Sequence, residues 1–100
     1  TECRKIAAMA NAFGVRYIPH AWGTGIALAA TLQLLAVLPY NPSSLYPLEP
    51  VLEFDQTEHP FRMEVITTPI VQVDGFVRIP EGPGLGVIVN KEAILKYQVG

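Results

Sequence analysis

The chain has 100 residues, of which 50% are hydrophobic and 16% are charged, and its formal net charge is −2 at pH 7. Its 7 basic residues are scattered, which excludes the basic patch that nucleic-acid binding requires. Soluble domains carry about a quarter charged residues. The apolar excess, and a first residue that is Thr1 rather than methionine, predict a piece of a larger parent protein that covers some of its faces.

A single cysteine, Cys3, provides neither a disulfide framework nor a metal cluster, which favours a reducing compartment such as the cytoplasm. The longest apolar run, residues 26–38, is interrupted by Thr31 and Gln33. It is also shorter than the roughly 20 residues that span a bilayer. We therefore expect a buried core helix and no contact with a membrane.

The first third of the chain predicts a helix, a strand and a second helix. Thr1 can cap a helix whose apolar residues have helical spacing, and Gly14 stands where a left-handed carboxyl-terminal cap is expected. Residues 15–19 are predicted to form a short strand. Residues 23–25 turn the chain into a helix over 25–38 that is apolar on nearly every side and should lie between other elements.

Closely spaced prolines predict an irregular connection over residues 39–47, and residues 51–55 are predicted to form a second short strand. Alternation of helices and strands is typical of an α/β protein with a parallel sheet. Because two strands cannot form such a sheet alone, the pattern again predicts missing neighbours.

The remainder of the chain predicts a β-hairpin. Asp74 and Gly75 separate the extended runs 66–73 and 76–80, and this pair favours the tight turn of a hairpin. The glycines and proline of residues 81–86 predict a sharply bent segment after it.

Two further features complete the predicted elements. Asn90 can cap a last helix over residues 91–97. His59 and Pro60 are expected in a polar loop, where His59 has no functional role.

Two ionisable residues follow the predicted strands: His20 comes after the first, and Glu53 lies near the end of the second. In parallel β/α proteins the carboxyl ends of strands form a concave mouth where functional side chains gather. Strand alternation places Leu52 and Phe54 against helices and directs Glu53 and Asp55 toward that mouth. From spacing alone, a histidine bonded to backbone and a solvated acid remain alternatives.

Other polar residues have simpler interpretations. By position alone, Asp55 and Glu58 are expected at the surface, and Trp22 is expected to pack or to form a wall. His20 and His59 lack the compact spacing of a zinc site.

Three segments carry a family resemblance, namely PHAWGTGIALAATLQLLA (19–36), LEFD (52–55) and VDGFVRIPEGPGLGV (73–87). They resemble the carboxyl-terminal part of the mandelate racemase and muconate lactonising enzyme family, within the enolase superfamily. The resemblance implies that residues 15–20 and 51–55 are strands seven and eight of a TIM-like β/α barrel. It also divides the chain into the last βα units of the barrel, residues 1–59, and a tail, residues 60–100, whose hairpin returns toward a capping domain.

The resemblance implies a magnesium-dependent enzyme that removes the proton α to a carboxylate and forms an enediolate. His20 matches the family's general acid/base after strand seven, and Glu53 matches the glutamate that hydrogen-bonds the substrate carboxylate. Trp22 and Asp55 are expected to contact the substrate. The carboxylates that hold Mg²⁺ would lie upstream, so this chain is expected to supply no metal ligand and to be inactive alone.

The segment HAWGTG resembles the acid-sugar dehydratase members most, which predicts a lyase; racemisation or epimerisation of a 2-hydroxy acid, an isomerase reaction, is the alternative. A different possibility is a non-catalytic interaction module that binds through the helix 26–38 or the hairpin 70–80. The expected partners are a small carboxylate substrate, the remainder of the barrel and further copies in a homo-oligomer, with no nucleic acid.

Overall fold

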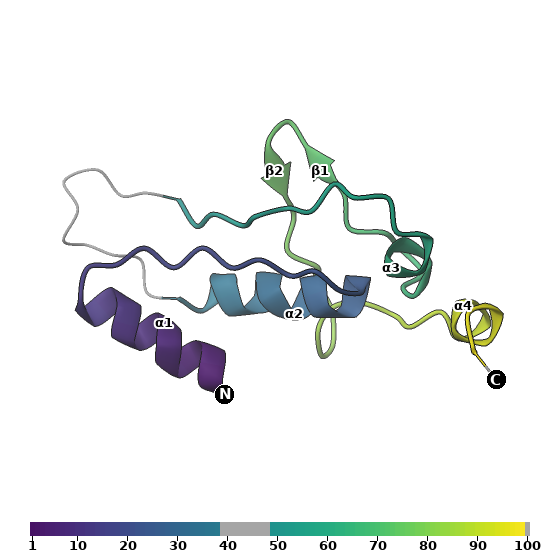
Figure 1. Cartoon of the computed structure of the whole chain (residues 1–100), viewed down its shortest axis with the longest axis horizontal. Helices are drawn as coiled ribbons and strands as arrows, with labels where there is room; N and C mark the ends of the chain where they lie inside the picture. The colour runs from purple at the N-terminus through teal and green to yellow at the C-terminus, as the bar shows by residue number, and fades with distance from the viewer. Residues whose placement is uncertain (39–48, 100) are drawn as a thin grey trace.

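A computed structural model describes residues 1–38 and 49–99, so the predicted irregular connection over 39–47 lies outside the described residues. The elements in chain order (Figure 1) are α1 (Glu2–Ala12), α2 (Gly25–Ala36), α3 (Pro60–Glu64), β1 (Gln72–Val73), β2 (Phe76–Val77) and α4 (Lys91–Lys96).

Helix α1 begins and ends close to the predicted positions. Thr1 is its N-cap, but the Thr1 side chain makes no capping hydrogen bond, so this detail of the prediction is wrong. Gly14 has a φ of +66°, which confirms the predicted left-handed residue after the helix. The apolar side chains of Ile6, Met9 and Phe13 are exposed in this chain.

The two predicted strands, residues 15–19 and 51–55, are extended segments that lie side by side and run in the same direction (Figure 1). The amide of Glu53 donates to the carbonyl of Pro19 at 3.0 Å, and one parallel bridge pairs His20 with Glu53. Helix α2 runs back between them, which is the βαβ connection that the alternation predicts. Within residues 1–38 and 49–99 neither segment has a further strand beside it, and their pairing is limited to that bridge.

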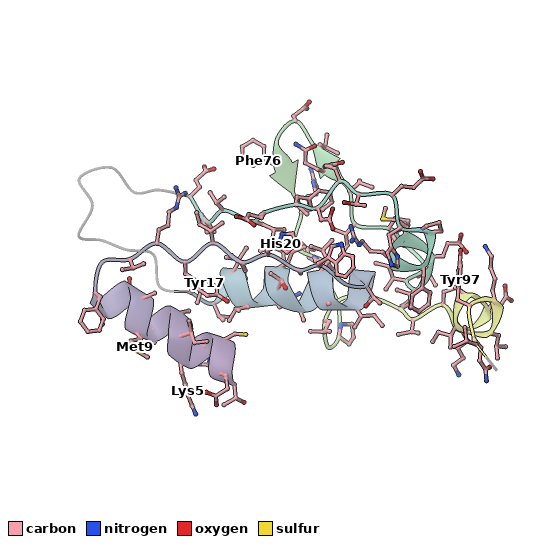
Figure 2. The ribbon with its side chains drawn as sticks, viewed as in Figure 1. Lys5, Met9, Tyr17, His20, Phe76 and Tyr97 are labelled. Carbon is pink, nitrogen blue, oxygen red and sulfur yellow. The ribbon has the colours of Figure 1, made fainter. Side chains whose placement is uncertain are left out.

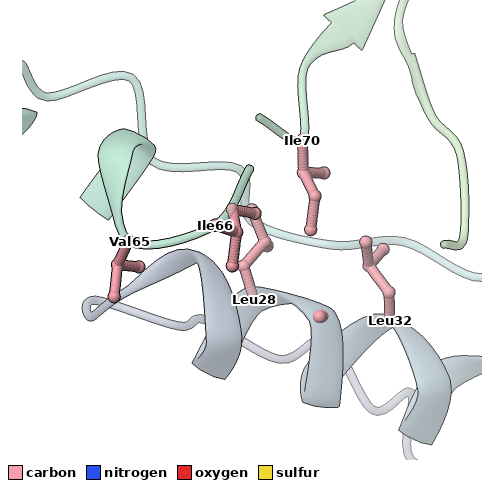
Figure 3. Close-up of a cluster of buried hydrophobic side chains, with 6 residues drawn as sticks. Leu28, Leu32, Val65, Ile66 and Ile70 are labelled. Carbon is pink, nitrogen blue, oxygen red and sulfur yellow. The ribbon is translucent and has the colours of Figure 1, made fainter. Parts of the chain in front are cut away.

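Helix α2 supplies half of the core. It begins after Thr24, whose hydroxyl accepts a hydrogen bond from the amide of Ala27 at 3.4 Å. Its buried side chains meet the segment that follows α3 (Figure 3), and the resulting cluster consists of Leu28, Ala29, Leu32, Val65, Ile66 and Ile70. Leu52 and Phe54 pack against this cluster, as strand alternation predicts. None of the helices in the described part of the chain is long and apolar enough to cross a bilayer.

Helix α3 stands where the sequence predicts a loop around His59 and Pro60. The Nδ1 atom of His59 accepts a hydrogen bond from the amide of Arg62 at 3.1 Å, so His59 is the N-cap. Pro60 occupies the first turn, where its fixed φ suits a helix and its missing N–H needs no partner. The prediction is wrong because histidine is an uncommon N-cap and the helix is too short for a clear apolar period.

The turn of the hairpin and the cap of the last helix confirm their predictions, but strands β1 and β2 have only two residues each and are shorter than the predicted runs 66–73 and 76–80. Strands β1 and β2 pair antiparallel, and Asp74 and Gly75 have φ values of 51° and 84°, both in the left-handed region. The side chain of Asn90 accepts hydrogen bonds from the amides of Glu92 and Ala93 and so caps α4.

Candidate functional site

His20 and Glu53 lie next to each other at the ends of the paired extended segments. The Nδ1 atom of His20 is 3.3 Å from Oε2 of Glu53. Their side chains are 46% and 65% exposed, so both face an open surface of this chain. His20 is labelled in Figure 2, on the same extended segment as Tyr17.

Backbone pairing brings these two side chains together. Glu53 bonds through its amide to the residue before His20, and the parallel bridge sets His20 and Glu53 directly beside each other. Paired residues of parallel strands point their side chains to the same face. An imidazole and a carboxylate in this arrangement can share a proton, and the carboxylate can hold the imidazole in a defined orientation.

The two ring nitrogens of His20 differ in their position relative to Glu53. Since Nδ1 faces Glu53, the second ring nitrogen, Nε2, points away from it. A neutral imidazole held in this way can accept a proton at Nε2 from a molecule bound over the pair.

Asp55 lies in a different environment from Glu53, although both lie on the same extended segment. Its Oδ2 atom accepts from the Arg62 guanidinium at 2.7 Å, and its Oδ1 atom accepts from the Thr57 amide at 2.7 Å. Bonds from the Thr57 hydroxyl and amide, together with Arg62, hold the pKa of Asp55 well below its usual range. The side chains of Asp55 and Arg62 are only 9% and 6% exposed.

The surface position expected for the Asp55 side chain is therefore wrong. Alternation directs Asp55 to the same side as Glu53, but Arg62 covers it and forms a buried ion pair with it. Both carboxylate oxygens of Asp55 have partners within the chain, so its surroundings differ from those of Glu53. The expected contact of Asp55 with a substrate stays a prediction.

Trp22 lies beyond His20 in the turn before α2 and is 73% exposed. The indole therefore packs against little of this chain, and the position leaves it available to a ligand or to covering protein. The carbonyl of the next residue, Gly23, accepts a hydrogen bond from Nε of Arg62 at 2.8 Å.

A hollow of about 620 Å³ opens beside this region. Its walls include Ala21, Phe54, Asp55 and His59, but neither His20 nor Glu53. It is thus separate from the pair, and we do not place the candidate chemistry in it.

The described residues do not fit a metal centre. Within residues 1–38 and 49–99 no three His, Cys, Asp or Glu side chains gather as a ligand set. Hard divalent cations need several oxygen ligands, and Glu53 is the only carboxylate beside His20 in the described chain.

Sequence reasoning missed Arg62. Its side chain links Gly23 to Asp55, and only the folded chain brings those residues together. The sequence offers only one sign of this role, an arginine shortly after His59 and Pro60. An arginine in such a short polar segment is usually solvent-exposed, so the sign does not indicate a buried residue.

Comparison with known proteins agrees with the resemblance noted in the sequence. Residues 1–93 match the enolase C-terminal domain-like family. The chain belongs to this family. Mandelate racemase-type proteins, cycloisomerases and dehydratases of the enolase superfamily are its relatives.

Two curated relatives and one solved structure illustrate the similarity of this enolase-family chain. D-galactarolactone cycloisomerase from Agrobacterium fabrum is 44% identical over 99% of the chain and 26% of the relative's length. D-gluconate dehydratase from Thermoproteus tenax is 34% identical over 98% of the chain and 18% of the relative. A structure described as a predicted mandelate racemase from Rhodobacter sphaeroides superposes with a TM-score of 0.75 at 28% identity, covering 97% of this chain and 23% of that one.

The chain thus spans about a quarter or less of the length of these relatives. It is an enolase C-terminal domain-like segment of mixed helix and strand content.

Proposed function

We propose that the parent protein is an enzyme of the enolase superfamily that removes the proton α to a carboxylate of an acid sugar. The observation that carries the proposal is the contact between His20 and Glu53, 3.3 Å apart on an open surface at the ends of two parallel segments. Relatives named as a cycloisomerase and a dehydratase support the acid-sugar class.

In this proposal residues 15–20 and 51–55 are the seventh and eighth strands of a β/α barrel, and the tail returns toward a capping domain. The parallel pairing through Glu53 and the exposed apolar side chains of α1 support that placement. The carboxyl ends of such strands form the mouth where catalytic groups of barrels gather.

His20 acts as the general base and, once protonated, as the general acid. A proton α to a carboxylate is weakly acidic, and its removal leaves an enediolate with additional negative charge on the carboxylate oxygens. Nδ1 of His20 faces Glu53, which leaves Nε2 to take the proton from carbon and to return it later.

Glu53 hydrogen-bonds the substrate carboxylate through the oxygen that does not face His20. To donate that bond its carboxyl must be protonated, which requires surroundings that exclude water. Glu53 is 65% exposed in this chain. The parts of the parent that lie outside these 100 residues must therefore supply the cover. Trp22, also exposed beside the pair, forms one wall of the substrate site.

Magnesium would stabilise the charge that develops on the substrate carboxylate. The residues of this chain do not fit a magnesium site, so its ligands belong to other parts of the parent.

Dehydration is the favoured outcome, because loss of a hydroxyl from the β-carbon follows directly from the enediolate when His20, now protonated, donates to the departing oxygen. Loss of a ring oxygen from the β-carbon needs the same first step, and the cycloisomerase relative makes it the second candidate. Return of the proton to the opposite face would give racemisation or epimerisation.

The test is exchange of the α-proton with solvent deuterium, measured by NMR on galactarate, gluconate and their lactones with the intact parent protein and Mg²⁺. We expect exchange or elimination with at least one acid, and a loss of about a thousandfold or more in His20→Asn, which keeps size and polarity but has no basic nitrogen. Undiminished exchange in His20→Asn would remove His20 from the mechanism. Absence of both exchange and elimination in the unaltered parent with every acid would contradict the proposed function as a whole.

A further inference from the structure

We propose that Arg62 is a positioning residue that fixes the distance between His20 and Glu53. This inference rests on the proposed function of that pair. Arg62 lies on α3, outside both extended segments, and no part of its guanidinium contacts the His20 or Glu53 side chain.

The guanidinium of Arg62 bonds to both stretches that follow the bridge between His20 and Glu53, namely residues 21–24 and residues 54–59. We call these two stretches the strand-end loops. Its Nε donates to the Gly23 carbonyl at 2.8 Å, in the loop after His20. Its terminal nitrogens donate to the Asp55 carbonyl at 3.3 Å and to the Asp55 carboxylate at 2.7 Å, in the loop after Glu53. One rigid planar group therefore sets the spacing of the two loops.

The pair itself has few other constraints at this end of the segments. The bond from the Glu53 amide to the Pro19 carbonyl joins them just before the loops begin. The next hydrogen bond from a side chain, which Arg16 donates to the carbonyl of Glu49 at 3.1 Å, lies at the opposite end of the two segments. Beyond the bridge, Arg62 is thus the connection that keeps the two loops in register within the described chain.

Arg62 is itself held firmly, which a positioning residue requires. Its backbone amide donates to Nδ1 of His59 at the start of α3. Directly after the helix, Val65 and Ile66 are each 2% exposed and anchor the chain in the core against α2. Arg62 is 5% exposed, and Asp55 neutralises its buried charge.

Lysine could not replace this arginine. An ammonium group is a compact point charge, whereas the contacts to Gly23 and Asp55 are made by different nitrogens of a planar fork. A lysine could reach one loop and would release the other. This difference separates a geometric role from a general requirement for a buried positive charge.

The test compares Arg62→Lys and Arg62→Met with a matched control in the intact parent protein. The control is Lys96→Met, which breaks a 2.7 Å ion pair between α4 and Glu64 of α3 but touches neither loop. Because a misplacement of about 1 Å can lower a rate about a hundredfold, we expect kcat to fall about tenfold in Arg62→Lys and about a hundredfold in Arg62→Met. KM should change less than about threefold, since substrate does not contact Arg62. Lys96→Met should keep the unaltered kcat.

A second readout does not depend on activity. In crystal structures of the same parent variants, the distance from His20 Nδ1 to Glu53 Oε2 should increase by about 1 Å or more in Arg62→Met and stay unchanged in Lys96→Met. If the unaltered parent shows neither α-proton exchange nor elimination, the proposed function fails, but this distance still tests the positioning role. If Arg62→Met does not fold, Asp55→Asn, which keeps size but loses the ion pair, takes its place.

The inference is overturned if Arg62→Lys keeps kcat within twofold of the unaltered parent, or if the distance between His20 and Glu53 is unchanged in Arg62→Met or Asp55→Asn. It is also overturned if Lys96→Met lowers kcat as much as Arg62→Lys does, because the effect would then follow from loss of any ion pair on α3.

Discussion

At the scale of single residues, position along the strand does not determine environment. Glu53 and Asp55 follow alternation to the same side, yet Glu53 stays open beside His20 while Asp55 is enclosed by Arg62. The difference arises because Arg62 of α3 bonds to Asp55, whereas Glu53 lies beside His20. A carboxylate enclosed with a guanidinium and two donors from Thr57 stays ionised at any ordinary pH.

Gly86 provides a residue-scale prediction. A Cβ on Gly86 would lie 2.5 Å from the carbonyl oxygen of Pro80, and its φ is +74°. Gly84, in the same bent segment, has a φ of +66°, but a Cβ at this position would have no atom within 4 Å. Gly84→Ala should therefore lower the free energy of unfolding by about 1 kcal/mol for the left-handed backbone alone. Gly86→Ala should lower it by about 3 kcal/mol, because the steric clash adds to that cost.

The measurement is denaturant unfolding of the intact parent protein carrying each variant. Equal losses in the two variants would mean that the segment relaxes away from Pro80, and the close approach would then have no energetic importance.

At the scale of elements, the start of α2 is fixed by its contact with the segment after α3. Gly25 is buried there, and a Cβ would lie 2.9 Å from the Arg62 carbonyl oxygen and 2.7 Å from Cδ1 of Ile66. The same approach of α2 and α3 brings the Arg62 side chain to the Gly23 carbonyl. Packing of these two helices therefore determines where the strand-end loops can lie.

Gly25→Ala should consequently destabilise the parent, although alanine favours a helix by about 1 kcal/mol over glycine. The contact with backbone at Arg62 cannot move without displacing α3, and overpacking of this kind costs about 1–3 kcal/mol. Gly23→Ala is the control, because its Cβ would lie at an ordinary 3.4 Å from Ala27. Thermal unfolding should give a lower midpoint for Gly25→Ala than for Gly23→Ala. A higher midpoint for Gly25→Ala would show that helix propensity outweighs the contact.

At the scale of the whole molecule, the chain exposes more surface than its size requires. A compact protein of 10.9 kDa should expose about 5,600 Å², whereas this chain exposes 7570 Å². Its radius of gyration is 15.3 Å, against about 13 Å for a compact domain of this length. Large apolar side chains are among the exposed groups, including Phe13, Trp22 and Ile88. The surface is therefore consistent with a segment that other protein covers.

The isolated 100-residue chain is accordingly expected to associate. Size-exclusion chromatography with light scattering should show aggregates or assemblies well above 10.9 kDa, because exposed apolar surface of this extent favours association. A stable compact monomer would contradict this expectation and would favour the alternative of an independent interaction module.

Local physical chemistry made several features predictable from the sequence. Gly14, the Asp74-Gly75 turn and the Asn90 cap depend on backbone preferences that act over a few residues, and each lies where the sequence indicates. The apolar pattern also identified α2 and the alternation of Leu52 and Phe54 toward the core. The position of His20 and Glu53 at paired strand ends follows from the βαβ pattern together with the family resemblance.

Tertiary structure alone decided the enclosure of Asp55, the short helix α3 and the bridging contacts of Arg62. Each depends on groups that are distant in sequence and meet only when α3 packs against α2. A five-residue helix has no periodic signal of its own, and an arginine becomes buried only where folding brings acceptors to all sides of its guanidinium. Backbone preferences that act over a few residues can therefore be predicted from the sequence. The hydrogen bonds of Arg62 and Asp55 beside the candidate site form only in the folded chain.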